Sequence, residues 1–507
     1  MAKSLFRAVI LVAVFAMVTR VLGFLFRIYL SRKLGANLLG VYQIASSVFM
    51  VLVLLVASGI PLTISKKSAR FFVLKNENMA HKTVTAGLLF GVTVSLIICL
   101  VFFLFKDYIS QIFADSSCMT VLLILLPAIV FSAIYSSLRG YLWGRQDYFF
   151  MGLGELIEQV VRIVVFILFA NLFLVNMSGA NVAALSLTVA CFVSMIFIII
   201  VYHKKGGRIK NPRGNIKGVI KSSLPITGVR AASSLIQPII ALLFPVMLSL
   251  SGVDKTSAVS VYGVIMGMTF PLLFLPSTVI GSLSFALIPE LSKAQEQKKL
   301  GLVEERIKSS MRFSIIVSSL IVPLYVGIGI PICSLLFDNA LSGEFLRWAA
   351  IIMIPMGLSN VSSSILNSLN LEVKSFVNNL IGGFFLILCV VCFSGVLGAY
   401  ALIVGFFLCM FSTSFLNIMM IKKKTKISLH LFKTLILCLL FSFIVAILSN
   451  YLYGVLLYAF PSLVCLIVSA TVSLVCFLVL LWAFGICDIA FIFSKVKNVI
   501  KFSKKRA

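Results

Sequence analysis

Long apolar stretches, separated by short polar segments, fill the chain from its N-terminus to its C-terminus. Fourteen of them reach the length of about 20 residues that a helix needs to cross the hydrocarbon core of a bilayer. The short alternating segments of a transmembrane barrel are not seen. The pattern therefore predicts an all-α polytopic membrane protein with about fourteen transmembrane helices. The expected spans lie near residues 8–30, 40–63, 84–105, 119–142, 153–175, 180–202, 222–250, 258–288, 313–337, 346–369, 375–394, 398–421, 432–453 and 459–483.

The composition agrees with this pattern and excludes a water-soluble fold. Of the 507 residues, 61% are hydrophobic and 11% are charged, whereas soluble domains are about 45–50% apolar and about 25% charged. The longest polar segments, 203–221 and 289–312, are too short to form a soluble catalytic domain. Any binding site is therefore expected between helices. The chain is not expected to be an enzyme.

The net charge of +28 reflects membrane topology. If the polar segments are assigned alternately to the two sides of the membrane, one side carries 33 lysines and arginines and the other carries five. Basic residues accumulate on cytoplasmic loops. We therefore predict a multi-pass protein of the bacterial cell membrane with both termini in the cytoplasm. Membrane lipids are expected partners because anionic headgroups attract such loops, and nucleic acid is not needed to explain the charge.

The chain shows signs of an internal duplication. Ile60-Pro61 and Ser65-Lys66 recur 228 residues later as Ile288-Pro289 and Ser292-Lys293, each pair at the cytoplasmic end of a predicted span. An even number of spans in each copy makes the copies parallel. We expect two parallel six-helix lobes around a central cavity, followed by two extra C-terminal helices. The predicted divisions are 1–210, 211–421 and 422–507, the last including a basic cytoplasmic tail.

The residues that commonly bind metals are not arranged for that purpose. The eleven cysteines lie mostly inside apolar stretches without paired spacing, which is typical of small core residues. His81, His203 and His430 are predicted to lie in polar loops. No glycine-rich nucleotide motif is found. The sequence predicts neither a metal site nor a cofactor.

Several short motifs resemble those of a transporter superfamily. The stretch Thr19–Phe24 (TRVLGF), followed by Leu34-Gly35-Ala36, resembles the opening of bacterial lipid II flippases. Arg139-Gly140-Tyr141 and Glu158-Gln159 are similar to the stage V sporulation protein B branch of polysaccharide transporters. Both groups belong to the multidrug/oligosaccharidyl-lipid/polysaccharide flippase superfamily. The resemblance covers the whole chain and implies outward flipping of an undecaprenyl-linked sugar precursor through a cationic cavity. Lipid II flippases usually carry an arginine and an aspartate just after the first motif, whereas this chain has Phe26 and Arg27.

Arginines inside the predicted spans are candidate substrate ligands. An arginine at the bilayer centre costs about 2.5–3.5 kcal/mol on insertion scales, so each one needs a partner or a function. Arg20 lies twelve residues into the first span, and Arg27 follows seven residues later on the same helical face. Their planar forks suit a diphosphate. Arg230 and Gln237 share a face of the seventh span, which prolines interrupt. For Arg20 the alternative is a structural role, in which it bonds to a broken neighbouring helix or holds a helix end. For Arg27 the alternative is that its side chain extends to the outer membrane surface. The prolines near Arg230 and Gln237 indicate either structural kinks or a movable gating helix.

The fifth span carries Glu155, Glu158 and Arg162, which we take as candidates for coupling or gating. Glu158 and Arg162 are four residues apart with the acid first, a spacing that favours an ion pair within one helix. The alternatives are that Glu158 takes up a coupling proton or acts as a switch between lobes. Arg139, near the cytoplasmic edge of its span, is expected to be an interfacial anchor.

The sequence features bear on three candidate functions. The leading one is a flippase that exports a lipid-linked anionic sugar precursor, lipid II-like, for cell-wall, spore-cortex or polysaccharide synthesis, with cell-wall synthesis proteins as candidate partners. A cation-coupled multidrug exporter of the same superfamily is the second, but the first span has two arginines and no carboxylate. A membrane-embedded glycosyltransferase is the third, and the short, acid-poor outer loops disfavour it.

Overall fold

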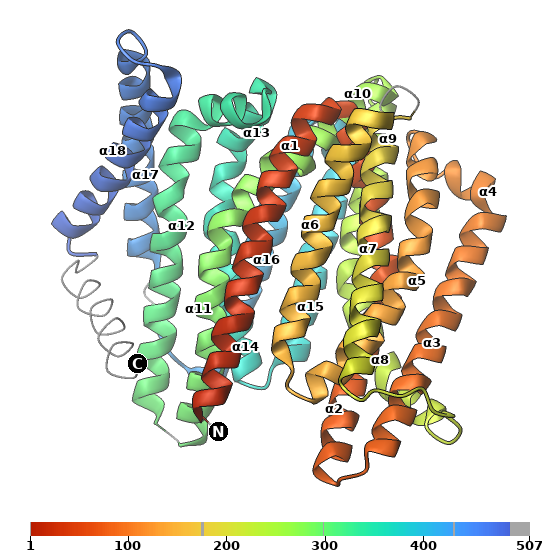
Figure 1. Cartoon of the computed structure of the whole chain (residues 1–507). Coiled ribbons are helices and arrows are strands. Elements are labelled where there is room, and N and C mark those ends of the chain that lie inside the picture. The colour runs from red at the N-terminus through yellow and green to blue at the C-terminus, as the bar shows by residue number, and fades with distance from the viewer. Residues whose placement is uncertain (1, 174–176, 298, 429–430, 487–507) are drawn as a thin grey trace. The chain divides into compact units, whose positions relative to one another are not determined.

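The structure is a computed structural model of the whole chain, and it describes all residues except 1, 174–176, 298, 429–430 and 487–507. The described residues form helices and short connections, without strands (Figure 1). Twelve helical segments in this part of the chain are long and apolar enough to cross a membrane. The all-α polytopic fold predicted from the apolar stretches is confirmed.

The number of spans lies close to the predicted fourteen. The first of the twelve segments, Val14–Val73, is 60 residues long, or about 90 Å at the helical rise of about 1.5 Å per residue. A bilayer core is about 30 Å thick, so this segment contains more than one crossing. It bends at Gly35, whose φ of 69° is a left-handed conformation that glycine adopts without a steric penalty. The helix Tyr148–Phe173 covers another predicted span. The exact count therefore depends on how these two helices are treated.

The chain divides into two compact units. The first comprises Met1–Met268 and Val390–Ala399, and the second comprises Thr269–Cys389 and the described residues from Tyr400 onward. In the first unit the helices are α1 (Ala2–Ala57), α2 (Ile60–Val73), α3 (Glu77–Leu104), α4 (Lys106–Ser110), α5 (Ser117–Gly144), α6 (Tyr148–Phe173), α7 (Gly179–Lys204), α8 (Ile216–Ser234), α9 (Ile236–Leu250) and α10 (Lys255–Gly263). A π-helical segment, η1 (Val264–Thr269), runs into the second unit.

The second unit contains the remaining helices. Its last two, α17 and α18, pack against each other and against α12. In the second unit the helices are α11 (Phe270–Glu296), α12 (Leu300–Phe337), α13 (Ala340–Ala349), the short 3₁₀ segment η2 (Ala350–Ile352), α14 (Met353–Ser368), α15 (Glu372–Leu397, whose end belongs to the first unit), α16 (Tyr400–Thr425), α17 (Leu431–Leu456) and α18 (Ser462–Ala483).

Small residues bring helices of the first unit into backbone contact. A Cβ added at Gly40 of α1 would lie 2.1 Å from the carbonyl oxygen of Val259 in α10. A Cβ at Gly59, between α1 and α2, would lie 2.4 Å from the Ser223 carbonyl oxygen in α8. Without a hydrophobic driving force between helices in lipid, such close packing is a main source of association. α8 and α10 are therefore held tightly against α1.

All three histidines were predicted to lie in polar loops. His430 lies outside the described residues, and His203 belongs to the last turn of α7, so the prediction is wrong there. It is wrong for His81 as well. The residue belongs to the second turn of α3 and is only 3% exposed. Its ring stacks on Tyr141 of α5, which also packs edge-on against Tyr202 of α7. The first turns of α3 carry Glu77, Asn78 and Lys82 besides His81, so the segment looked like a loop in the sequence.

The second unit is held together by buried uncharged polar groups. The Asn378 amide of α15 donates to the Asn417 carbonyl oxygen of α16 at 2.9 Å. The Asn417 amide donates in turn to the hydroxyls of Ser362 and Ser363 in α14, at 3.2 and 3.0 Å. Hydrogen bonds of this kind between membrane helices contribute about 0.6 kcal/mol each on average. They fix the orientation of α14, α15 and α16.

Candidate functional site

Arg162 of α6 lies between the two halves of α1. Its guanidinium donates a hydrogen bond to the Tyr42 hydroxyl, beyond the bend at Gly35. The same guanidinium lies 5.2 Å from the centre of the Phe26 ring, before the bend. A cation over an aromatic face contributes about 0.5–2 kcal/mol, depending on how far it is desolvated. Arg162 therefore connects the first two predicted spans to the fifth.

Two further arginines lie on the first half of α1, before the bend. Arg27 is half-buried and lies within electrostatic range of Arg162 and Tyr42. Arg20 lies seven residues earlier, about two helical turns, and its side chain is exposed. In the described part of the chain, Arg20 makes no hydrogen bond or ion pair. We call Arg20, Arg27, Arg139 and Arg162 the arginine cluster.

Both glutamates of α6 contact neighbouring helices. The Glu155 carboxylate forms an ion pair with Arg139 of α5. The Glu158 carboxylate accepts a hydrogen bond of 3.3 Å from the Ser194 hydroxyl of α7. The spacing of Glu158 and Arg162 predicts an ion pair between them, but the hydrogen bonds described for both residues run to other helices. Successive turns of α6 thus contact α5, α7 and α1.

Several polar atoms around the arginine cluster are buried without a hydrogen-bond partner among the described residues. They include the Nε atoms of Arg139 and Arg162, the Tyr135 hydroxyl and the amide nitrogen of Gln159. A buried polar group without a partner is unfavourable by about 1–3 kcal/mol. These groups, on α5 and α6, are therefore suited to a ligand that accepts hydrogen bonds. Gly23 of α1 leaves the space for Gln159, whose side chain would lie 3.8 Å from a Cβ there.

The structure places Arg230 and Gln237 elsewhere in the first unit. The Arg230 guanidinium donates to the Ser58 carbonyl oxygen, at the junction of α1 and α2, over 3.3 Å. Gln237 is exposed at the start of α9. Pro238 lacks an N–H, so the helix loses a hydrogen bond at this point and α8 ends at Ser234. This contact of Arg230 joins α8 to the junction of α1 and α2.

The sequence did not identify Tyr42, Tyr135 or Ser194 as residues of a functional site. Tyrosine and serine are common inside membrane helices, so composition gave no signal for any of them. Their partners come from helices far apart in the chain: Tyr42 and Arg162 are 120 residues apart. To predict these three residues, one would have had to know which polar residues of different helices face each other.

The site carries a net positive charge. The arginine cluster and the two glutamates of α6 together carry four positive charges and two negative ones. No group of three or more histidine, cysteine, aspartate or glutamate side chains converges in the described residues. The guanidinium groups of the cluster are hydrogen-bond donors, and phosphate oxygens accept hydrogen bonds from such groups.

The fold is one that solved membrane transporters share. The structure is similar to that of the lipid II flippase MurJ in an inward closed conformation, with a TM-score of 0.71, 15% sequence identity, and coverage of 94% of this chain and 98% of that one. It is also similar to an inward-facing multidrug resistance MATE family transporter of the MOP superfamily, with a TM-score of 0.65, 15% identity, and coverage of 83% and 98%. These similarities show that the chain shares the fold of these transporters.

Residues 5–295 match the polysaccharide biosynthesis protein family, and the chain belongs to that family. Stage V sporulation protein B of Bacillus subtilis (strain 168) is 28% identical over 399 residues, which cover 75% of this chain and 76% of that protein. Sporulation protein YkvU of the same organism is 22% identical over 350 residues, 66% of this chain and 73% of that protein. The chain is thus a multi-pass membrane protein of the polysaccharide biosynthesis protein family, similar to stage V sporulation protein B.

Proposed function

We propose that this protein flips an undecaprenyl-linked oligosaccharide or peptidoglycan precursor from the inner to the outer leaflet of the bacterial cell membrane. The observation that carries the proposal is the arginine cluster on α1, α5 and α6, with unpaired donors beside it. Such precursors carry a diphosphate between lipid and sugar, and guanidinium groups bind phosphate oxygens in pairs of parallel hydrogen bonds. In this proposal Arg20, Arg27 and Arg162 hold the diphosphate.

The proposed mechanism is alternating access by the two lobes, residues 1–210 and 211–421, with both termini in the cytoplasm. Arg162 contacts both halves of α1, so a bound anion that attracts its guanidinium weakens the bond to Tyr42. Glu155 and Glu158 tie α6 to α5 and α7 and supply the coupling or gating contacts. Arg230 and Gln237 contribute from α8 and α9 in this scheme, and no catalytic step is part of it.

A cation-coupled multidrug exporter is the second candidate. Two observations favour it: the similarity to a MATE family transporter and the partly buried Glu158 carboxylate, which accepts a hydrogen bond from Ser194. The arginine cluster opposes it, because a net positive site repels cationic drugs. The flippase is therefore the better supported of the two.

Reconstitution of the purified protein in vesicles separates the two candidates. A fluorescent undecaprenyl-diphosphate sugar is placed in the membrane, and its transbilayer movement is followed by chemical quenching from outside. We expect protein-dependent movement of this lipid, and none of a matched undecaprenol without phosphate. Efflux of ethidium driven by a cation gradient, without movement of the diphosphate lipid, would reverse the assignment.

A further inference from the structure

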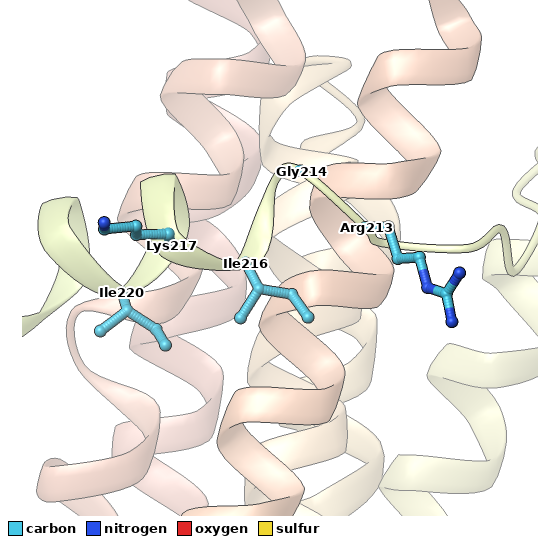
Figure 2. Close-up of a pocket in the computed structure, with 5 residues that line it drawn as sticks. All are labelled: Arg213, Gly214, Ile216, Lys217 and Ile220. Atoms are coloured by element: carbon cyan, nitrogen blue, oxygen red, sulfur yellow. The ribbon is translucent and has the colours of Figure 1, made fainter.

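The start of α8 forms a pocket that the transport site does not use. Its volume is about 580 Å³, and it is lined by Arg213, Gly214, Ile216, Lys217 and Ile220. Figure 2 shows Arg213 before the Gly214 turn and Lys217 on the first turn of the helix, with their side chains extending in opposite directions. The Ile216 and Ile220 side chains extend to the same side. Gly214 has a φ of 87°, a left-handed conformation that suits glycine and that turns the chain into α8. The pocket therefore combines two cations with two branched apolar side chains.

The segment that carries the pocket is fastened to α3. The Lys210 backbone N–H donates to the Thr85 hydroxyl at 3.1 Å. The Asn215 side-chain amide donates to the Thr83 hydroxyl at 3.2 Å, directly before the first turn of α8. These bonds lie on both sides of Arg213. Its backbone is thus held in place, which lowers the conformational entropy lost when its side chain binds a ligand.

The charge of this segment is not compensated locally. Residues 203–221 contain seven lysines and arginines, and no aspartate or glutamate is present from residue 203 to residue 253. Arg213, Lys217 and Lys221 are all exposed. Within the described structure, neither Arg213 nor Lys217 has a hydrogen bond or ion pair from its side chain. An anionic ligand would supply the missing countercharge.

The surface changes from basic to apolar along α8. Ile220 follows Lys217 by about one turn, and Leu224, which is 59% exposed, follows by two turns, so that cation and apolar side chain are about 10 Å apart along the axis. The same helix begins a candidate membrane span, Ile216–Leu250. A phospholipid has this same sequence of groups, a charged phosphate followed within a few ångströms by acyl chains, whereas a free phosphate ion would leave the apolar half unused.

We propose that this pocket binds an anionic phospholipid, with its phosphate against Lys217 and its acyl chains along Ile220 and Leu224. Arg213 adds positive charge from the other side of the Gly214 turn. The bound lipid holds the loop and the start of α8 at the membrane surface. This inference concerns a second ligand and does not depend on the transported substrate.

Native mass spectrometry of the full-length protein tests the proposal by counting bound lipids during titration with phosphatidylglycerol, and with zwitterionic phosphatidylcholine as the comparison lipid. We expect one high-affinity phosphatidylglycerol. Since each basic residue near an anionic lipid surface strengthens binding about fivefold, Arg213→Gln/Lys217→Gln weakens it about 25-fold. Lys422→Gln/Lys423→Gln, which removes the same charge from exposed positions at the end of α16, leaves that site unchanged.

Two further arms separate the source of the phosphate and the role of the apolar residues. Ile220→Ser/Leu224→Ser is expected to weaken phosphatidylglycerol binding without adding phosphatidylcholine binding, and millimolar inorganic phosphate is expected not to displace the lipid. Equal affinities of the wild type and Arg213→Gln/Lys217→Gln would overturn the proposal. Equal binding of phosphatidylcholine, or displacement by inorganic phosphate alone, would overturn it as well.

Discussion

Replacing Arg162 by glutamine distinguishes a guanidinium that binds substrate from one that only joins helices. The variant removes the positive charge together with its two described contacts, the hydrogen bond to Tyr42 and the position over Phe26. A hydrogen bond to a charged group contributes about 1.5–3 kcal/mol. Since about 1.4 kcal/mol corresponds to a factor of ten, the loss of one such bond to the diphosphate lowers flipping about 10- to 150-fold.

Tyr42→Phe is the matched control, because it removes the same hydrogen bond and leaves the charge. A hydrogen bond between membrane helices contributes about 0.6–1.7 kcal/mol, so we expect a small loss of thermal stability. Flipping per folded molecule is expected to stay within about threefold of the wild type. Arg162→Lys, which keeps the charge but not the planar fork, should lie between the two.

The assay is transbilayer movement of the fluorescent diphosphate lipid at a concentration well below saturation, divided by the amount of folded protein in the vesicles. The detergent melting temperature of each variant is measured in parallel. Two results contradict the reasoning: normal flipping by folded Arg162→Gln, or an equal loss in Tyr42→Phe. The second result would mean that Arg162 acts by positioning α1 and not by binding the anion.

The remaining predictions concern Arg20, helix packing, energetics and topology. Arg20→Ala should lower flipping per folded molecule about tenfold, with partial recovery in Arg20→Lys, because only the planar fork binds a diphosphate bidentately. Gly40→Ala should destabilise the protein by about 1–3 kcal/mol in a melting experiment, since its Cβ would lie 2.1 Å from the Val259 carbonyl oxygen. Collapse of an inside-negative membrane potential with the pH gradient intact should slow flipping, because moving one charge across 100 mV is worth about 2.3 kcal/mol. A cysteine placed in the loop 203–221 should react with an impermeant maleimide only in inverted vesicles.

Each of these predictions has its own control and its own contrary result. Gly228→Ala is the partner of Gly40→Ala, because a Cβ at that position of α8 meets nothing within 4 Å; equal melting temperatures for the two would contradict the packing argument. Equal activity of Arg20→Ala and the wild type would remove Arg20 from the binding site. A rate that follows only the pH gradient would favour Glu158 as a coupling group. Rapid labelling of the loop in intact cells would reverse the predicted topology.

The sequence alone determined that the chain is an all-helical membrane protein. Helices in a bilayer must satisfy their backbone hydrogen bonds internally, so each crossing requires a continuous apolar stretch, and such stretches are visible without any tertiary information. The same reasoning marked the arginines inside spans as unusual, because each is unfavourable in hydrocarbon. Gly35, which belongs to a motif quoted from the sequence, occupies the bend between the first two predicted spans.

Tertiary structure decided which of these charged residues meet. The spacing of Glu158 and Arg162 indicated a pair within one helix, yet Arg162 bonds to Tyr42 on α1 and Glu158 to Ser194 on α7. A contact within a helix follows from its periodicity. A contact between helices depends on how the two helices are rotated and packed against each other, and the sequence of one helix does not specify this. The same holds for the polar segment around His81, which its composition predicted to be a loop and which lies in α3, with the His81 ring buried and stacked on Tyr141 of α5. Helical periodicity and the free energy of transfer into the membrane are properties of a single chain segment and can be read from its sequence. Which side chains of different helices meet depends on packing in three dimensions.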